Sequence, residues 1–426
     1  MVTACLAVGA QAPYATGTAS VAVIAPQAGS GYPSALARRG RHAVAVTLGF
    51  GTRPPAYRDV AADEAYTDVI EYDGDLRRTV KKLRATGVEA VVAASPVGVE
   101  LAERIAWQLR LPGSGIPGST RLRTDRGIQS AALSQAGITA PRSLRTTHLA
   151  EALAWADRLQ LSAYQLTAAA IGLPVRPVSC HTRHQIAAVW PMIQEAAYRH
   201  SGNASLVLQE RVEGRQYVVD SVTQLGPDGP QYAITGIWTH LHASTGLLDR
   251  TDLVHRRSLL ARRLSPYVRR TLDTLGVASG PTSCHLAFEP ERGPVLLSAS
   301  AVTHRSRADE AVWEITDRDP IDATLDGPLF TYRSNRNSPH ICVSRIYVDA
   351  QQQDESGPQL LQDLAALPTA ACVDKDPNSL ISQTAALRPG GKTCEIVLAH
   401  EDSEAIEKDY SLIRDLTADL YRNRHR

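Results

Sequence analysis

Two pairs of side chains in the second half of the chain combine residue types and spacing that suit chemistry. His240 and His242 lie two residues apart, as do Ser298 and Ser300, so on β-strands the members of each pair share one face. Imidazoles that converge can bind a transition metal or transfer a proton. A serine beside a histidine suggests a hydrolase, but the chain has no G-x-S-x-G motif. Both pairs can equally be ordinary polar residues of a cleft.

The charge of the chain argues against two classes of partner. Its 426 residues include 45 basic and 44 acidic side chains, for a net charge of +1, which gives no basis for binding nucleic acid or an anionic membrane. The six cysteines show no CxxC spacing, the N-terminus has no basic segment, and no apolar run reaches the length of a transmembrane helix. We therefore expect a cytoplasmic protein with reduced thiols.

Strand and helix patterns alternate along the first part of the chain. SVAVIAP, HAVAVTLGF and EAVVAAS are apolar strand patterns, and DLRRTVKKLRATG places apolar residues at helical spacing before a glycine. Alternation of this kind predicts an α/β fold with a doubly wound, Rossmann-like domain over 20–118. Residues 1–19 are expected to form a loose leader.

Three further regions follow in the predicted organisation: a small helical and strand lobe over 119–205, a central α+β lobe over 206–330, and a C-terminal α/β subdomain with an antiparallel sheet over 331–426. In the central lobe we expect paired strands over Leu206–Thr223 and Tyr232–His242, joined by a PDG turn. A helix over Leu259–Leu275, the strands SCHLAFEP and GPVLLSASA, and a charged helix from about Ser403 complete the pattern.

Four segments resemble ATP-grasp carboxylate–amine ligases, and in particular the bacterial L-amino-acid ligases that form dipeptides. They are SPVGVELAERIAWQLRLPGS, STRLRTDRGIQSAALSQAGI, LVLQERVEGRQYVVD with the following ITGIW, and LGVASGPTSCHLAFEPERGPVLLSASAV. The resemblance covers roughly residues 20–320 and implies an ATP-grasp fold. In such ligases lysines and magnesium ions stabilise phosphoryl transfer from ATP to a carboxylate.

The resemblance implies that the phosphate site has lost most of its charge. The chain has only five lysines and none between Lys82 and Lys375. Arg126 stands where the first family lysine is expected, and Thr167 stands where the second is expected. The loop that should be rich in glycine reads IGLPVRP, with Leu173 and Arg176 at glycine positions.

The implied magnesium site has lost its carboxylates. His285 and Ser298 align with the two family glutamates, and Ser300 and Val302 take neighbouring metal or substrate positions. Magnesium prefers oxygen ligands, and imidazole is a poor substitute. His285 would point into the same cleft as His240 and His242, which keeps open a site for a transition metal or for proton transfer.

The adenine side of the implied site is better preserved. Gln209 and Glu210 retain the hinge dipeptide of the family, and Gly214, Tyr217 and Asp220 also remain. Gln216 stands where glutamate is usual. The resemblance therefore implies a vestigial nucleotide site at Arg126, Gln209, Glu210 and Gln216.

The function that we expect is that of a degenerate ATP-grasp protein without ligase activity and without a resident cofactor. It would act in peptide natural-product biosynthesis, by binding an amino acid or dipeptide, or as a homodimer or a heterodimer with an active homologous ligase. The first alternative is an active ATP- and magnesium-dependent ligase, with Arg126 and Arg176 replacing lysines and Asp249 or Asp252 binding metal. The second is a cleft repurposed for metal or acid–base chemistry through its histidines.

Overall fold

The computed structural model describes residues 19–26, 30–55, 57, 65–112, 114–116, 118–173, 175–226, 228–243, 248–303, 307–326, 341–349, 357–374 and 393–422. The predicted leader lies outside this set, except for Ala19. Over the described ranges, no helix is both long and apolar enough to cross a membrane.

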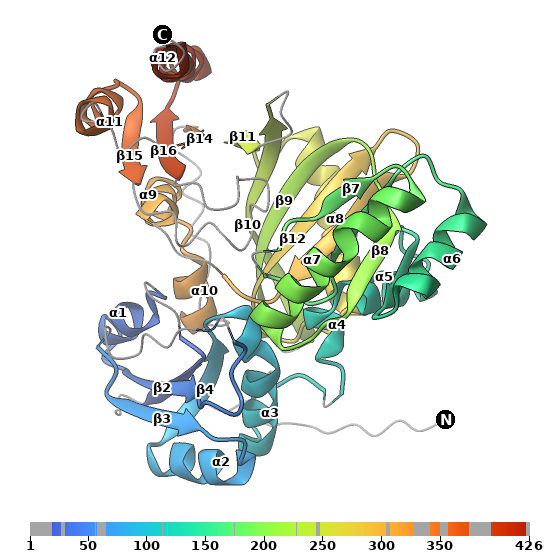
Figure 1. Cartoon of the computed structure of the whole chain (residues 1–426). Helices are drawn as coiled ribbons and strands as arrows, with labels where there is room; N and C mark the ends of the chain where they lie inside the picture. The colour runs from blue at the N-terminus through green and yellow to red at the C-terminus, as the bar shows by residue number, and fades with distance from the viewer. Residues whose placement is uncertain are drawn as a thin grey trace.

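The N-terminal domain is a parallel four-stranded sheet with helices on both faces (Figure 1). Its strand order is β3-β2-β1-β4. The elements are β1 (Ser20–Ile24), α1 (Tyr32–Ala37), β2 (His42–Leu48), β3 (Asp68–Tyr72), α2 (Leu76–Ala85), β4 (Val88–Ala93), a 3-10 turn (Pro96–Gly98) and α3 (Val99–Leu109). In β1, Ala22 and Ile24 pack with α2 and α3, whereas Val21 and Val23 pack with α1. The predicted strand–helix alternation is confirmed, and β3 is an additional strand.

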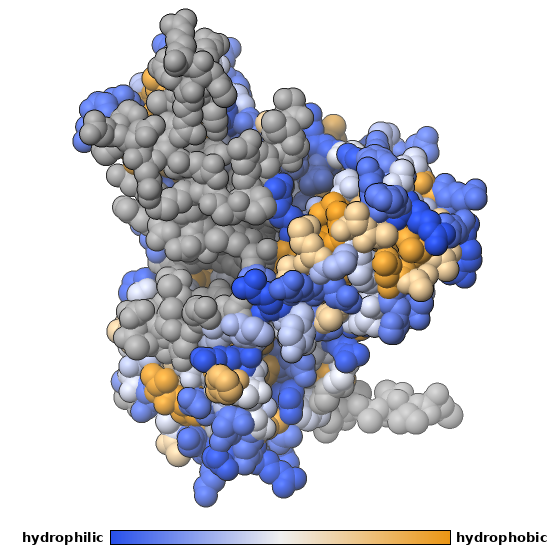
Figure 2. All heavy atoms as spheres, viewed as in Figure 1, coloured by the Kyte–Doolittle hydropathy of each residue, from blue (hydrophilic) through white to orange (hydrophobic). Residues whose placement is uncertain are grey.

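The small lobe is an antiparallel sheet of order β5-β8-β6-β7. Trp155 of α6 and Ile186 and Trp190 of α7 pack with Leu166 and Leu208 of its strands in one buried apolar cluster. The elements are α4 (Arg121–Thr124), α5 (Arg126–Gln135), β5 (Ser143–Thr146), α6 (Leu149–Leu159), β6 (Tyr164–Ala168), β7 (Val178–Cys180), α7 (Arg183–Ser201) and β8 (Leu206–Glu210). Apolar side chains also gather on the outer face of this lobe near α7, which carries the exposed Met192 and Tyr198 (Figure 2).

The predicted single strand over Leu206–Thr223 is wrong. Strand β8 belongs to the small-lobe sheet, and β9 (Arg215–Gly226) belongs to the large sheet, where it pairs with β10 (Gly229–His242). Gly214 separates them with φ +118°, and a side chain there would place a Cβ 2.2 Å from the Phe288 carbonyl oxygen. The small-lobe sheet therefore extends past the predicted boundary at residue 205.

The large sheet has eight antiparallel strands in the order β13-β12-β9-β10-β11-β14-β16-β15. The C-terminal strands continue the central sheet through β11 and β14 instead of forming a separate one. The remaining elements are β11 (Leu248–Leu253), α8 (Leu259–Thr274), β12 (Gly280–Glu289), β13 (Gly293–Ser300), α9 (Arg307–Thr316), α10 (Pro320–Asp326), β14 (Cys342–Asp349), α11 (Gly357–Ala365), β15 (Ala370–Asp374), β16 (Thr393–His400) and α12 (Ser403–Arg422).

One buried arginine connects three parts of the fold. Arg123 of α4 donates hydrogen bonds to the Glu103 carboxylate on α3 and, through Nη1, to the carbonyl oxygens of Leu275 (2.7 Å) and Gly276 (3.1 Å) after α8. Only 5% of Arg123 is exposed. The N-terminal domain, the start of the small lobe and the central lobe therefore meet at one charge-assisted contact.

We expect Arg123→Ala to lower the free energy of unfolding by about 3 kcal/mol, because it leaves the Glu103 carboxylate without its cationic partner and two carbonyl oxygens without their donor. Urea unfolding followed by tryptophan fluorescence measures the change. Arg78→Ala is the matched control, since the Arg78–Asp73 ion pair is exposed and its loss should cost less than about 0.5 kcal/mol. Equal effects of the two substitutions would contradict the role assigned to Arg123.

Candidate functional site

A cavity of about 730 Å³ lies between the small lobe and the large sheet. Strands β6 and β7 and the loop between them form one wall, and β9, β10, β12 and β13 form the other. The polar side chains of this main cavity are Arg126, Gln165, Arg176, Ser179, Arg211, Arg215, Gln216, His240, His242, Ser283, His285, Ser298 and Ser300. Among its described lining residues, four are arginines and none is aspartate or glutamate.

The structure brings together eight of the residues singled out from the sequence, all of which line the main cavity. They are Arg126, Arg176, Gln216, His240, His242, His285, Ser298 and Ser300. Arg211 and Arg215 were not predicted. They lie on either side of Gly214. A basic residue before and after this glycine was the feature of the sequence that could have indicated them.

Arg126 is a partly buried cation in the wall of the main cavity. It begins α5, where the Asp125 side chain caps the helix by accepting hydrogen bonds from the backbone of Gly127 and Ile128. Arg126 Nη1 donates to Thr167 Oγ1 at 3.2 Å, so the two predicted phosphate-site positions are neighbours. Arg126 Nε is shielded from solvent and has no partner among the described residues. Burial lowers the pKa of Arg126 to about 10, which leaves it cationic at neutral pH.

The loop after β6 is held by apolar packing. Leu173 and Val175 are buried in the small-lobe core and, like Arg176, line the main cavity. Gly172 has φ +73° and lies so close to Pro96 that a Cβ would come within 2.4 Å of its ring. The loop is therefore fixed by contacts on both sides. Among its residues that line the cavity, Arg176 is the one that carries charge, and the others are apolar or glycine.

The three predicted histidines form a row along the large sheet. The ring centroids of His240 and His285 lie 5.3 Å apart, and those of His240 and His242 lie 6.2 Å apart. His285 Nε2 is 3.1 Å from Gln216 Oε1. Burial, Arg126 and His242 lower the pKa of His285 to about 4, and burial lowers the pKa of His240 and of His242. The row is therefore uncharged at neutral pH.

The histidine row does not combine with a familiar set of metal ligands. No group of three or more His, Cys, Asp or Glu in the described part of the chain is arranged to hold a metal ion. Ser298 lies opposite His285 in the β12–β13 pairing. The hydrogen bond that the structure shows for the His285 ring is to Gln216 and not to Ser298, so this pair gives no support for a hydrolase.

The two hinge residues predicted for adenine are engaged with other side chains. Gln209 is 1% exposed, and its amide donates to Gln165 Oε1 at 3.1 Å. The Glu210 carboxylate pairs with Arg142 and with Arg292, each at 2.7 Å. Burial raises the pKa of Glu210, but the two arginines outweigh it and lower the net value. Neither residue lines the main cavity, although Gln165 does.

Asp249 and Asp252, which the first alternative considers as metal ligands, are engaged with other side chains. Asp249 accepts hydrogen bonds from Tyr410 and Arg414 on α12, and Asp252 pairs with Arg250 and accepts a hydrogen bond from Ser344. These contacts fasten β11 to the C-terminal elements, and neither carboxylate lines the main cavity.

Comparison with solved structures identifies the fold. L-amino acid ligase from Bacillus licheniformis has a TM-score of 0.65 at 13% identity, over 93% of this chain and 97% of that one. Carboxyaminoimidazole ribonucleotide synthase from Aspergillus clavatus, complexed with ATP, has a TM-score of 0.66 at 13% identity, over 94% and 98%. N5-carboxyaminoimidazole ribonucleotide synthetase from Thermus thermophilus has a TM-score of 0.63 at 16% identity, over 93% and 98%.

These neighbours are ATP-grasp enzymes, and the chain has the ATP-grasp fold that its sequence predicted. No protein-family model matches the chain. No curated protein matches it either. At identities this low the likeness concerns the fold, and the chemistry has to be inferred from the site.

The lowered pKa of His285 makes the stability of the protein depend on pH. Between pH 6.5 and about 4 the unfolded chain binds a proton that the folded His285 does not, so stability falls as the pH falls through this window. We expect His285→Gln to remove about 2 kcal/mol of the loss in unfolding free energy between pH 7 and pH 5. Urea unfolding at both pH values measures it, with exposed His184→Gln as the control. Parallel pH profiles for wild type and His285→Gln would contradict the assignment.

Proposed function

We propose that this protein binds an organic anion in its ATP-grasp cleft and does not perform magnesium-dependent ligation. The observation that carries this proposal is the charge of the main cavity, whose described lining includes Arg126, Arg176, Arg211 and Arg215 and no carboxylate. The histidine row is uncharged, so the arginines set the sign of the field. Guanidinium groups suit phosphate and carboxylate groups, because their planar donors bind two oxygens at once.

The unsatisfied Nε of Arg126 supports an anionic ligand. This buried donor has no hydrogen-bond partner among the described residues. Arg126 Nη1 bonds to a hydroxyl, Nε has no partner, and the neighbouring Thr167 carries no charge. A cation with a buried, unused donor is costly unless a ligand completes its hydrogen bonds. A phosphate or carboxylate in the cavity would supply both the negative charge and the acceptor.

The absence of carboxylates from the described cavity lining supports the loss of metal-dependent chemistry. Magnesium requires hard oxygen ligands, and acyl-phosphate formation from ATP requires the ion to offset charge on the transferring phosphoryl group. Glu210 is held by Arg142 and Arg292, and Asp249 and Asp252 are held by the C-terminal elements. None of these acids is available at the main cavity.

An active ligase is a second candidate, because Arg126 and Arg176 both line the cavity where the resemblance expects phosphate contacts. The two functions differ in their need for metal. If the protein is an anion-binding protein, it binds ATP or pyrophosphate equally well with magnesium and with a chelator. It then releases no phosphate when ATP and mixed amino acids are present. A ligase requires magnesium and releases phosphate with its own substrate.

We expect pyrophosphate, titrated calorimetrically in the presence of a chelator, to bind to the wild-type protein. Arg126→Gln should weaken this binding by at least about tenfold, because one charge-assisted contact to a buried phosphate is lost. The control is Arg183→Gln, since Arg183 is exposed and pairs with Asp157 outside the cavity. Binding that appears only with magnesium, or an affinity unaffected by Arg126→Gln, would contradict the proposal.

Several other expectations stay predictions from the sequence. They are a role in peptide natural-product biosynthesis, regulation of an active homologous ligase, assembly as a homodimer or heterodimer, and a location in the cytoplasm. Anion binding is compatible with an amino acid or dipeptide as the ligand, because both carry a carboxylate.

A further inference from the structure

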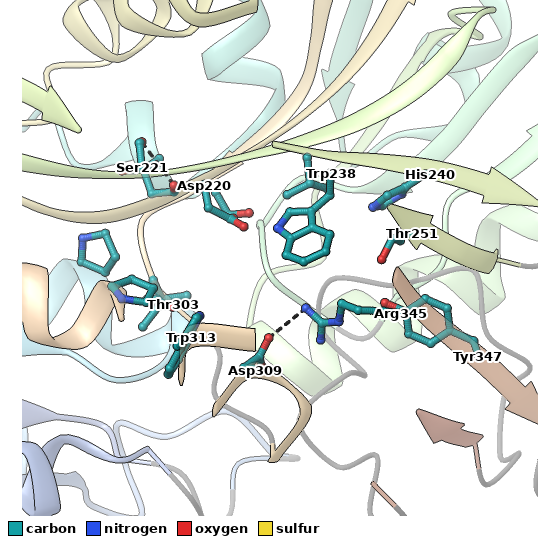
Figure 3. Close-up of a pocket in the computed structure, with 16 residues that line it drawn as sticks. Asp220, Ser221, Trp238, His240, Thr251, Thr303, Asp309, Trp313, Arg345 and Tyr347 are labelled. Atoms are coloured by element: carbon teal, nitrogen blue, oxygen red, sulfur yellow. Dashed lines mark hydrogen bonds and ion pairs between the residues drawn. The ribbon is translucent and has the colours of Figure 1, made fainter. Parts of the chain in front are cut away.

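A second, smaller cavity of about 90 Å³ adjoins the main cavity (Figure 3). Val218, His240 and Ser283 line both, so the two spaces share part of their walls. We call this space the side cavity. Strands β9 and β10 contribute Asp220 and Trp238 to it, and α9 and β14 contribute the residues opposite, including Asp309 and Arg345.

Negative charge predominates in the side cavity. Arg345 pairs with Asp309 at 2.9 Å and also with Glu395 behind it, so its single positive charge already has two carboxylates as partners. Asp220 adds a third carboxylate, and its hydrogen bonds come from the neutral side chains of Ser283 and Trp238. His240 is uncharged. The side cavity is therefore opposite in sign to the main cavity.

Aromatic side chains supply much of the remaining wall. Trp238, Trp313 and Tyr347 line the side cavity, and the guanidinium of Arg345 already lies 5.6 Å from the centroid of the Trp238 ring. Aromatic faces attract cations, most strongly when the cation is shielded from water. Carboxylates together with tryptophan rings are a familiar environment for ammonium groups.

We infer that the side cavity binds an ammonium group, and that the ligand of this protein is an organic anion with an amine or methylated amine at its other end. This inference rests on the proposed function for the anionic end. The side cavity, at about 90 Å³, is small beside the main cavity of about 730 Å³, so only one end of the ligand would lie in it. The remainder of the ligand would then lie in the main cavity, past His240.

The state of Asp220 provides an independent readout of an ammonium guest. Burial, and to a smaller extent Asp309, raises the pKa of Asp220 to about 6, against the opposing effects of its hydrogen bonds and of Arg345. The other titratable neighbours are His240, which is neutral, and Cys284, whose thiol is kept protonated by burial. An ammonium guest favours the ionised carboxylate, so its affinity should rise with pH through about 6 and then level off.

The first test compares ethyl phosphate with O-phosphoethanolamine and aminopropyl phosphate, which carry the same anion plus an ammonium group. By calorimetry with a chelator present, we expect the better amine to bind at least about tenfold more tightly than ethyl phosphate. Asp220→Asn should abolish the tighter binding of the amines without changing the affinity for ethyl phosphate. Arg126→Gln should weaken all three ligands by a similar factor.

The second measurement is the pH dependence of the ratio between the affinities for the amine ligands and for ethyl phosphate, and it requires no variant. Because all three ligands carry a phosphate monoester, most of the effect of phosphate ionisation cancels in the ratio of affinities. In wild-type protein we expect this ratio to be about tenfold smaller at pH 5 than at pH 7, since Asp220 is then mostly protonated. A ratio independent of pH, or one that persists in a folded Asp220→Asn variant, would overturn the inference.

The two proposals fail in different ways. If ethyl phosphate binds and neither amine improves on it, the side cavity does not bind ammonium but the anion site stands. If no phosphate binds, while methylammonium chloride quenches tryptophan fluorescence in wild type and not in Asp220→Asn, the anion proposal fails and the ammonium site stands. If neither probe binds, both are wrong.

Discussion

The alternation of side chains along β9, β10, β12 and β13 is the constraint on which the site depends. Tyr217, Val219, Cys284 and Leu286 point to one face, where they pack with α8 in a buried apolar core. Their neighbours Gln216, Val218, Ser283 and His285 must then point to the other face, where they line the cavities. Because the core face is fixed by burial, a shift of register by one residue would exchange the two sets.

This geometry places two environments of opposite charge on one sheet face. The main cavity takes its arginines from the small lobe and from the chain on either side of Gly214, and the side cavity takes its carboxylates from β9 and from α9. His240 lines both cavities and is neutral, so it lies between the positive and the negative cavity without adding charge to either. A ligand with charges of both signs is the simplest guest for such an arrangement.

The ATP-grasp fold is maintained here at low sequence identity to its structural neighbours. Identities of 13–16% with the neighbours are sufficient for the fold, because the three lobes depend on apolar packing and on the contact of Arg123 with Glu103 and the end of α8. A catalytic site tolerates much less change, since each lost lysine or carboxylate removes charge at a reacting atom. Fold and chemistry can therefore separate in the same chain.

Local patterns in the sequence were sufficient to predict most elements of the N-terminal domain, the helix α8 and the β12–β13 pair. They also predicted that His240 shares a face with His242, and Ser298 with Ser300. These features follow from periodicity, which is a property of neighbouring residues. The same patterns merged β8 with β9, since both are apolar strands and nothing local shows that they join different sheets. The pairing of Glu210 with Arg142 and Arg292 could not be predicted from local patterns, because these partners are distant in sequence. The side cavity is lined by Asp220, Asp309 and Arg345, which are far apart along the chain and come together only in the folded structure.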